Sequence, residues 1–191
     1  DKTNELTHKD IQKPKYNQLF KRSKKEISSF GVTSSTIWIK LIITNKTNEK
    51  NWILKNEVVW HDYFDFFSMD NGKLKIIKTG DRRPFSTRDL KYRGFAFNIS
   101  PKEKSIYYIK IKSKDDLSIP FEILTLRDFL LEEKDVMMGY ALFYGAILIM
   151  VFYNLITYFF TRDSSYLYYS LAISGIVWVN AAANGIAFQF L

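Results

Sequence analysis

Residues 136–161 read VMMGYALFYGAILIMVFYNLITYFFT and carry no formal charge. A helix needs about 20 predominantly apolar residues to cross the hydrocarbon core of a bilayer, and this stretch is longer. A buried core helix of this kind would need a large soluble body around it, which the mostly β-patterned residues in front of it do not supply. We therefore expect residues 136–161 to form a first transmembrane helix.

A second apolar stretch follows at residues 164–191 and becomes more polar towards its end, with Asn180, Asn184 and Gln189. This composition predicts a second span that packs on other helices, joined to the first by the short turn RDSS at residues 162–165. Asn154 lies deep in the first span. An unpaired amide there would be costly, so we expect it to hydrogen-bond a neighbouring helix through Asn180 or Asn184, as packing rather than as a transport site.

The charges lie almost entirely in front of these helices, because Arg162 and Asp163 are the only charged residues after Asp135. The net charge of +8 is carried by lysines scattered over the front part, without a basic helix or a glycine-rich aromatic motif, so nucleic acid is not an expected partner. The chain has no cysteine, which excludes disulfides and thiolate sites. His8 and His61 are far apart, so we expect neither a metal nor a cofactor.

Alternating apolar residues predict strands from residue 36 onwards. Ile37, Ile39, Leu41 and Ile43 share one face of such a strand. Asp-Asn-Gly at residues 70–72 predicts a hairpin, and Pro120 predicts a sheet edge or a strand end. About seven short strands with turn signals between them predict an all-β jelly-roll or β-sandwich domain. The expected strands cover residues 36–44, 51–56, 58–67, 73–79, 94–100, 105–113 and 118–125.

The domain boundaries follow from these patterns. Residues 1–15 are polar and aperiodic and predict a flexible lead-in, residues 16–125 form the sandwich, and residues 126–135 have the spacing of a helical stalk that continues into the first span. No hydrophobic signal segment precedes residue 1. Either a signal peptide has been removed, or the domain stays in the cytoplasm.

The loop TGDRRPFSTR at residues 79–88 permits two interpretations. As structure, Gly80 permits a tight turn, Asp81 accepts backbone N–H groups, and Pro84 fixes φ. As a ligand site, the arginines recognise carboxylates or hydroxyls, the aspartate accepts hydroxyl donors, and nearby tryptophans stack on a sugar ring. The structural interpretation is favoured for Asp81 and Arg88. The candidate ligand-binding residues are Asp81, Arg82, Arg88, Trp38, Trp52 and Trp60.

Catalysis finds little support in the sequence. Asp62 and Asp65 are three apart on a predicted strand, so their side chains point to opposite faces and do not form an acid–base pair. The sequence has no phosphate loop, zinc motif or nucleophile elbow. We therefore expect no enzymatic activity and name no catalytic residue.

The front part contains Phe30-Gly31, STIWIKLIITN, TGDRRPFSTR and SIYYIKIKS. These segments resemble the second type of extracellular domain in a bacterial family, the seven-transmembrane receptors with diverse intracellular signalling modules. The apolar part resembles the first two helices of the family's seven-helix region. Its marks are Tyr144-Gly145, Tyr153-Asn154, Arg162-Asp163, Ser165-Tyr166-Leu167-Tyr168 and Asn184-Gly185.

The resemblance implies a periplasmic domain similar to carbohydrate-binding jelly rolls, with helices in the bacterial cytoplasmic membrane. The domain would sense a small molecule or a carbohydrate, and the helices would pass the signal to a kinase, cyclase or phosphatase module. If the resemblance holds for the whole protein, five further helices and that module would lie outside these 191 residues. The expected partners are the ligand and the lipid bilayer, and a homodimer is left open.

Two alternative functions for the chain do not involve signalling. The chain could be a membrane-tethered carbohydrate-binding module that transmits nothing, or a subunit of a transporter or channel.

Overall fold

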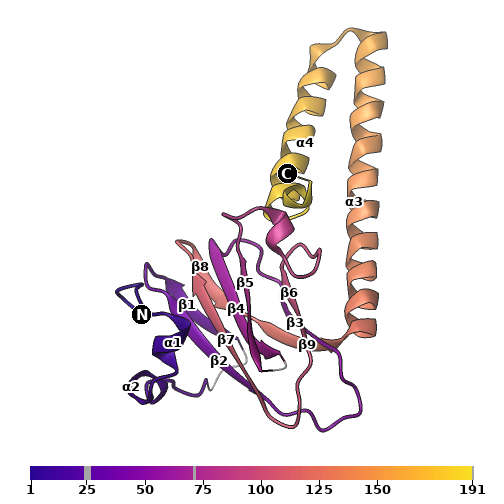
Figure 1. The fold of residues 1–191 in the computed structure, drawn as a ribbon. Coiled ribbons are helices and arrows are strands. Elements are labelled where there is room, and N and C mark those ends of the chain that lie inside the picture. Colours follow the sequence, from indigo (N-terminus) through magenta and orange to yellow (C-terminus); the bar gives the residue numbers. More distant parts are fainter. Residues whose placement is uncertain (24–26, 71, 191) are drawn as a thin grey trace. The chain divides into compact units, whose positions relative to one another are not determined.

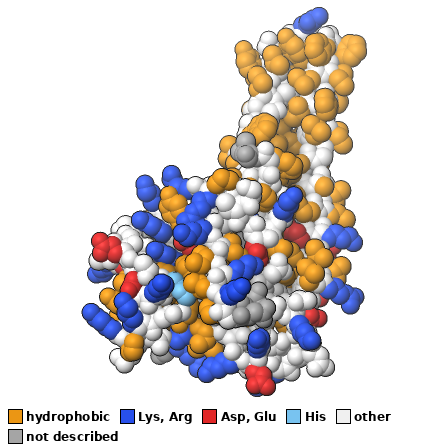
Figure 2. Space-filling model, viewed as in Figure 1, with side chains coloured by type: hydrophobic (Ala, Val, Ile, Leu, Met, Phe, Trp, Pro, Cys, Tyr) orange, Lys and Arg blue, Asp and Glu red, His pale blue; other side chains and the backbone are white. Residues whose placement is uncertain are grey.

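The computed structural model describes residues 1–23, 27–70 and 72–190, and it divides into two compact units, Asp1–Leu126 and Arg127–Phe190 (Figure 1). The first unit is rich in strands, and the second is built of helices. Charged side chains gather on the β-rich unit, whereas hydrophobic ones cover the visible face of the long helices (Figure 2). The predicted division into a hydrated β-rich part and an apolar helical part is confirmed.

Two antiparallel sheets make up most of the first unit. A four-stranded sheet has the order β2-β7-β4-β5, a three-stranded sheet has the order β6-β3-β9, and β1 pairs with β8. The strands are β1 Ser28–Val32, β2 Ile37–Ile43, β3 Trp52–Asn56, β4 Tyr63–Asp70, β5 Lys73–Thr79, β6 Phe95–Ile99, β7 Ser105–Lys112, β8 Asp116–Ile119 and β9 Phe121–Thr125.

An aromatic core joins the two sheets. Phe64 and Phe66 of β4 are fully buried and stack on Phe95 and Phe97 of β6, with ring centroids 4.6 Å apart for Phe64–Phe95 and 4.5 Å apart for Phe66–Phe97. Leu117 and Ile119 of β8 belong to the same core. Burial of this apolar surface is the main force that holds the sheets together. The predicted β-sandwich is confirmed.

The predicted alternation is also confirmed. Ile37, Ile39, Leu41 and Ile43 pack against the core, so the side chains between them face outwards. Pro120 stands between β8 and β9, where a missing N–H breaks no ladder.

The strand predicted at residues 58–67 starts later, at Tyr63, and β1 was not predicted. The residues before Tyr63 are held by a different set of bonds. The His61 carbonyl accepts the Asp81 N–H at 2.9 Å, and the Asp62 carbonyl accepts the Arg82 N–H at 3.3 Å. This segment therefore holds the loop that follows β5 instead of extending the sheet.

The predicted hairpin connects β4 to β5. The two strands pair antiparallel up to Asp70 and Lys73, and Gly72 has a φ of +78°, as a tight turn requires. Asn71, the central residue of the predicted turn, lies outside the described residues.

Residues 1–15 are not a flexible lead-in. They form α1 (His8–Ile11) and lead into α2 (Pro14–Asn17). Thr7 and Asp10 cap α1 reciprocally, and the amino group of Asp1 donates to the Thr36 carbonyl at 2.8 Å. Ile11 is only 2% exposed and packs in a cluster with Phe67 and Tyr108, so the segment is part of the domain.

The second unit contains two long helices, α3 (Leu126–Thr161) and α4 (Ser164–Ala183), both long and apolar enough to cross a membrane. The predicted stalk and first span form one uninterrupted helix. Asp163 begins α4 as its N-cap, because its carboxylate accepts the Ser165 N–H at 2.9 Å.

The second span ends earlier than predicted. It stops at Ala183, followed by Asn184 as C-cap and by the short 3₁₀ helix η2 (Ala187–Gln189). Gly185 has a φ of +71°, the left-handed conformation that commonly terminates a helix.

The hydrogen bonds made by the asparagine side chains of the helices differ from the expectation. Asn154 is buried but donates to the Met150 carbonyl of its own helix at 2.8 Å, and Asn180 donates to the Ile176 carbonyl at 2.9 Å. Within the described residues, a polar contact between α3 and α4 is instead made by the Ser170 hydroxyl and the Val151 carbonyl, 3.4 Å apart. The packing role of Asn154, Asn180 and Asn184 against further helices stays a prediction.

Candidate functional site

The loop after β5 begins at Gly80, where the chain passes very close to its neighbour. A Cβ at this position would lie 2.2 Å from the Asp62 carbonyl oxygen, and the φ of Gly80 is +145°. Real side-chain carbons do not approach so closely, and L-residues avoid this φ. The glycine therefore fixes how the loop meets the start of β4.

Two of the loop arginines form ion pairs with aspartates at the start of β4. The Arg82 Nε donates to Asp62 at 2.9 Å, and Arg83 donates to Asp65 and also to the Thr79 carbonyl at 2.7 Å. Asp62 and Asp65 thus act as partners of the loop. Arg82 remains 57% exposed, so its side chain lies at the surface of the domain.

Arg88 lies inside the domain. It donates to the Gly94 carbonyl and covers the rings of Phe95 and Phe85, with its guanidinium carbon 4.3 Å and 5.3 Å from the ring centroids. Burial lowers the pKa of Arg88 to about 10. A side chain held this way supports the loop, as the structural interpretation predicted.

Asp81 is half-buried between the same segments. Its N–H donates to the His61 carbonyl, and burial, followed by the nearby Asp62 charge, raises the pKa of its carboxyl group. A carboxylate whose charge is disfavoured in this way is a poor ligand for a cation. The expected acceptance of backbone N–H groups is not seen at the Asp81 Oδ1, which is buried without a hydrogen-bond partner among the described residues. The three arginines of the loop, in contrast, are bound by aspartates and backbone carbonyls.

The three candidate tryptophans do not assemble at one site, although Trp60 directly precedes His61, whose carbonyl accepts the Asp81 N–H of this loop. Trp38 lies on the outer face of the four-stranded sheet, 5.6 Å from the Phe67 ring. Trp52 starts β3 in the other sheet and donates its indole N–H to the Glu49 carbonyl at 3.2 Å. Trp60, which is 46% exposed, precedes β4. Sequence reasoning grouped residues that the fold separates.

A pocket of about 210 Å³ lies elsewhere, where α1 covers the outer face of β4 and β7. The His8 ring stacks on Phe67 with centroids 4.7 Å apart and meets the edge of Tyr108 at 5.3 Å. The space-filling view shows a histidine beside a hydrophobic area on this unit (Figure 2). The pocket is lined by His8, Gln12, Phe67, Ser68, Met69, Ile106 and Tyr108.

The pocket suits an uncharged ligand. Its lining, within the described residues, includes no Lys, Arg, Asp or Glu side chain. Burial lowers the pKa of His8, which favours the neutral imidazole. An aromatic floor with an amide, hydroxyls and an imidazole at its rim is the mixture that small-ligand sites favour.

Lysines beside the pocket hold the N-terminal segment in place. Lys110 donates to the Leu6 carbonyl at 3.3 Å and lies over the Trp38 ring, and Lys40 donates to the Asn17 side chain at 2.8 Å. These contacts connect the lead-in residues to β2 and β7. The pocket is therefore built by residues that are distant in sequence.

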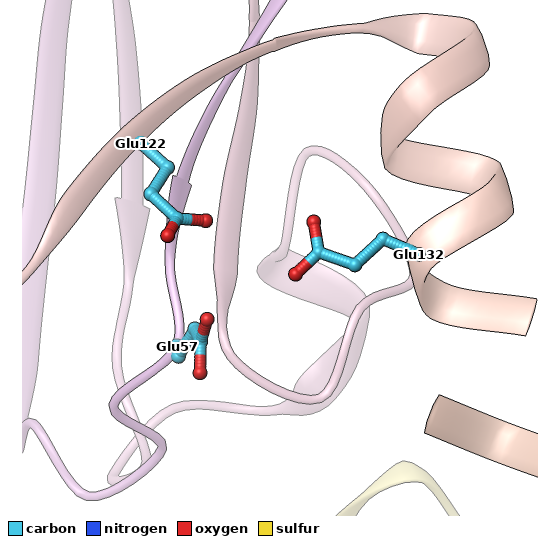
Figure 3. A group of neighbouring side chains, drawn as sticks. All are labelled: Glu57, Glu122 and Glu132. Atoms are coloured by element: carbon cyan, nitrogen blue, oxygen red, sulfur yellow. The ribbon is translucent and has the colours of Figure 1, made fainter. Parts of the chain in front are cut away.

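A pair of glutamates in the first unit lies close enough for both to offer a ligand atom to one metal ion. Glu57 and Glu122 are neighbours in Figure 3, and both bind Lys55, at 3.3 Å and 2.8 Å. Lys55 is buried and compensates one of their two negative charges, which disfavours a cation. Glu132, also drawn in Figure 3, comes from α3 and belongs to the second unit.

Sequence reasoning missed the pocket because its residues carry no recognisable motif. One local signal was present: Thr7 and Asp10 have the spacing of a reciprocal helix cap, which marks a helix start inside the presumed lead-in. Recognising that helix would have suggested that residues 1–15 fold onto the domain.

Comparison with known families assigns both units. Residues 1–125 match the family described as 7TMR-DISM extracellular 2, and residues 137–191 match the family described as 7TM diverse intracellular signalling. The first match begins at residue 1, so it includes the N-terminal segment that forms the pocket. No curated protein matches the chain at a significant level.

Proposed function

The chain belongs to the 7TMR-DISM receptors, and on that premise we propose that its extracellular domain binds a small neutral ligand under α1 and passes the signal directly into α3. In this family, an extracellular sensor domain is followed by signalling helices in the membrane. The proposal adds to this a place for the ligand and a route for the signal.

One observation carries the proposed route: no residue separates the sheet from the membrane helix. β9 ends at Thr125, and α3 begins at Leu126. β9 is also tied to the sandwich, because it pairs along its whole length with β3 and its Glu122 binds the buried Lys55. A displacement of β9 therefore moves the first residues of α3 instead of being absorbed by a flexible linker.

α3 is suited to carry such a displacement. It runs from Leu126 to Thr161 without a proline, so it has no residue of the type that most often kinks helices. Ligand binding would shift the population between two arrangements of the helices, in proportion to the difference in affinity for the two arrangements.

The pocket supports a neutral, hydroxyl-bearing ligand such as a single sugar ring. Phe67 and Tyr108 offer apolar ring surface, and Ser68 offers a hydroxyl. Gln12 and His8 hydrogen-bond each other, with Gln12 Nε2 and His8 Nε2 3.2 Å apart, so they offer a ligand their remaining polar atoms. This composition agrees with the carbohydrate sensing that the family resemblance implies. We place the domain in the periplasm and the helices in the bacterial cytoplasmic membrane, and we assign the chain no catalytic step.

A linker insertion tests the proposed route. The chain in lipid nanodiscs is spin-labelled at cysteines introduced at Lys134 and Ala183, since it has no cysteine of its own. A panel of methyl pyranosides is then added. We expect a binding sugar to change the distance distribution between the labels.

Insertion of Gly-Gly-Ser between Thr125 and Leu126 should leave sugar affinity unchanged and remove this change in distance. A distance distribution that stays the same when the uninterrupted chain binds sugar would reject signalling and favour a tethered binding module.

A further inference from the structure

A row of exposed apolar side chains crosses the outer face of the four-stranded sheet next to the pocket. Ile42 of β2 is opposite Ile106 of β7, and Met69 of β4 is opposite Leu74 of β5. Met69 and Ile106 both line the pocket, which joins the two pairs into one row. The exposed fractions are 55% for Ile42, 39% for Ile106, 59% for Met69 and 40% for Leu74.

The row is unusual for a solvated sheet face. The outer face of such a sheet normally carries polar residues, and contiguous exposed apolar surface commonly marks a binding site. Ile76 adds to it, because it is 45% exposed and lies opposite Phe67 of the pocket floor. Three strand spacings make the row about 14 Å long.

The shape of the row restricts what it could bind. It is one residue wide except at β5, where Ile76 lies beside Leu74, so it offers much less than the roughly 800 Å² per partner that a standard protein interface buries. At one point of its length it opens into the pocket, whose lining is uncharged. A narrow apolar strip joined to a neutral polar pocket matches a molecule that has one part of each kind.

We propose that the natural ligand is a neutral amphiphile, whose polar head occupies the pocket under α1 and whose apolar chain lies along Ile42, Ile106, Met69 and Leu74. This inference rests on the proposed function, because it assigns the ligand class to the same pocket. Its head would bond to Gln12, Ser68 or His8, and its chain would bury the apolar row.

The test uses methyl and hexyl pairs of the same pyranosides as probes. The chain in nanodiscs carries ¹³C-methyl methionine and isoleucine, and Met69 is one of four methionines, which is identified by Met69→Leu. We expect the hexyl member to bind about thirtyfold more tightly, if each partly buried methylene contributes about a factor of two. The signals of Met69 and Ile106 should shift.

Variants outside the pocket test the contribution of the ligand's apolar chain to affinity separately from that of its polar head. The double variant Ile42→Gln/Leu74→Gln changes both ends of the row, so it should reduce the advantage of the hexyl probe about fivefold or more whichever way the apolar chain runs from the pocket, and leave methyl pyranoside affinity unchanged. Val32→Gln is the matched control, because Val32 is 78% exposed in β1, outside this sheet. It should change neither affinity.

The outcomes distinguish the two proposals. Equal affinity for methyl and hexyl probes, with shifts at Met69 and Ile106, would overturn the amphiphile and leave the sensor pocket standing. No shift with either probe would overturn both. A Met69 shift on changing the nanodisc lipid from neutral to anionic, without probe, would assign the row to the membrane surface and also overturn the inference.

Discussion

The loop at residues 79–88 and the outer face under α1 differ in how well their amino-acid composition indicates a binding role. The loop is rich in charge, yet Arg82, Arg83 and Arg88 are bound to Asp62, Asp65 and the Gly94 carbonyl. The outer face has little charge at its pocket, yet it leaves polar groups beside exposed apolar surface. Functional groups are therefore better recognised by what remains available after folding than by their density in sequence.

The largest effect should come from Gly80→Ala in the loop. Its Cβ would overlap the Asp62 carbonyl, and the φ of +145° disfavours any L-residue, so we expect a loss of about 4 kcal/mol or more. Thermal unfolding followed by the β-sheet circular dichroism signal measures it. Gly31→Ala is the control, since Gly31 has a φ of +64° but open space around it, and should cost about 1 kcal/mol.

If Gly80→Ala melted like Gly31→Ala, the loop would not be the rigid element described here.

The two histidines sharpen the comparison through pH. His61, beneath the loop, is fully buried, and burial lowers its pKa to about 4 from an ordinary value of 6.5. The unfolded chain therefore binds a proton first as pH falls. The contribution of neutral His61 to the free energy of unfolding is fully present above pH 6.5. As the pH falls from 6.5 to 4, this contribution decreases by about 3 kcal/mol.

His61→Phe should remove this loss, because a phenyl ring does not titrate and can pack against Phe64 and Phe95, whose ring centroids each lie 5.9 Å from that of the imidazole. His8→Phe is the control on the outer face and should keep most of the loss. Urea unfolding at pH 7 and pH 4 compares them. Parallel pH profiles for wild type and His61→Phe would show that His61 does not govern acid stability.

Arg88→Met should cost about 2 kcal/mol, because it leaves the buried Gly94 carbonyl without its donor while preserving much of the apolar contact with Phe95. Sugar affinity should not change. A loss of sugar binding with unchanged stability would indicate that the ligand binds at the loop and not under α1.

The smallest effect should come from Arg82→Gln. The Arg82–Asp62 pair is more than half exposed on the arginine side, and such pairs contribute below about 1 kcal/mol. Neither melting temperature nor sugar affinity should change clearly. A large loss of affinity would identify Arg82 as a ligand contact.

The sequence predicted the features that depend on neighbouring residues. The charge-free run at 136–161 indicates a membrane helix by itself, and the alternation of Ile37, Ile39 and Leu41 indicates a half-buried strand by itself. The sandwich and the helices therefore agree with the prediction. Contacts between distant residues, in contrast, leave no local pattern.

The pocket and the loop pairs are features of that second kind. Ile11 is a single apolar residue in a polar stretch, and its burial depends on Phe67, which is far along the chain. Likewise, the Arg82–Asp62 pair follows from the way β4 and β5 meet, which residue types alone do not specify. The end of α4 at Ala183 could have been predicted from local sequence, because Asn184-Gly185 follows it and a glycine in the left-handed conformation commonly ends a helix.

Site-specific blocking tests the central claim most directly, because a single introduced cysteine has no competitor in this chain. Gln12, at the pocket, and Ser86, in the loop, are both exposed positions for a bulky maleimide label on Gln12→Cys or Ser86→Cys. Pyranoside binding in nanodiscs is then measured before and after labelling. We predict that the label at position 12 abolishes binding and that the label at position 86 leaves it unchanged; the reverse result would contradict a site under α1.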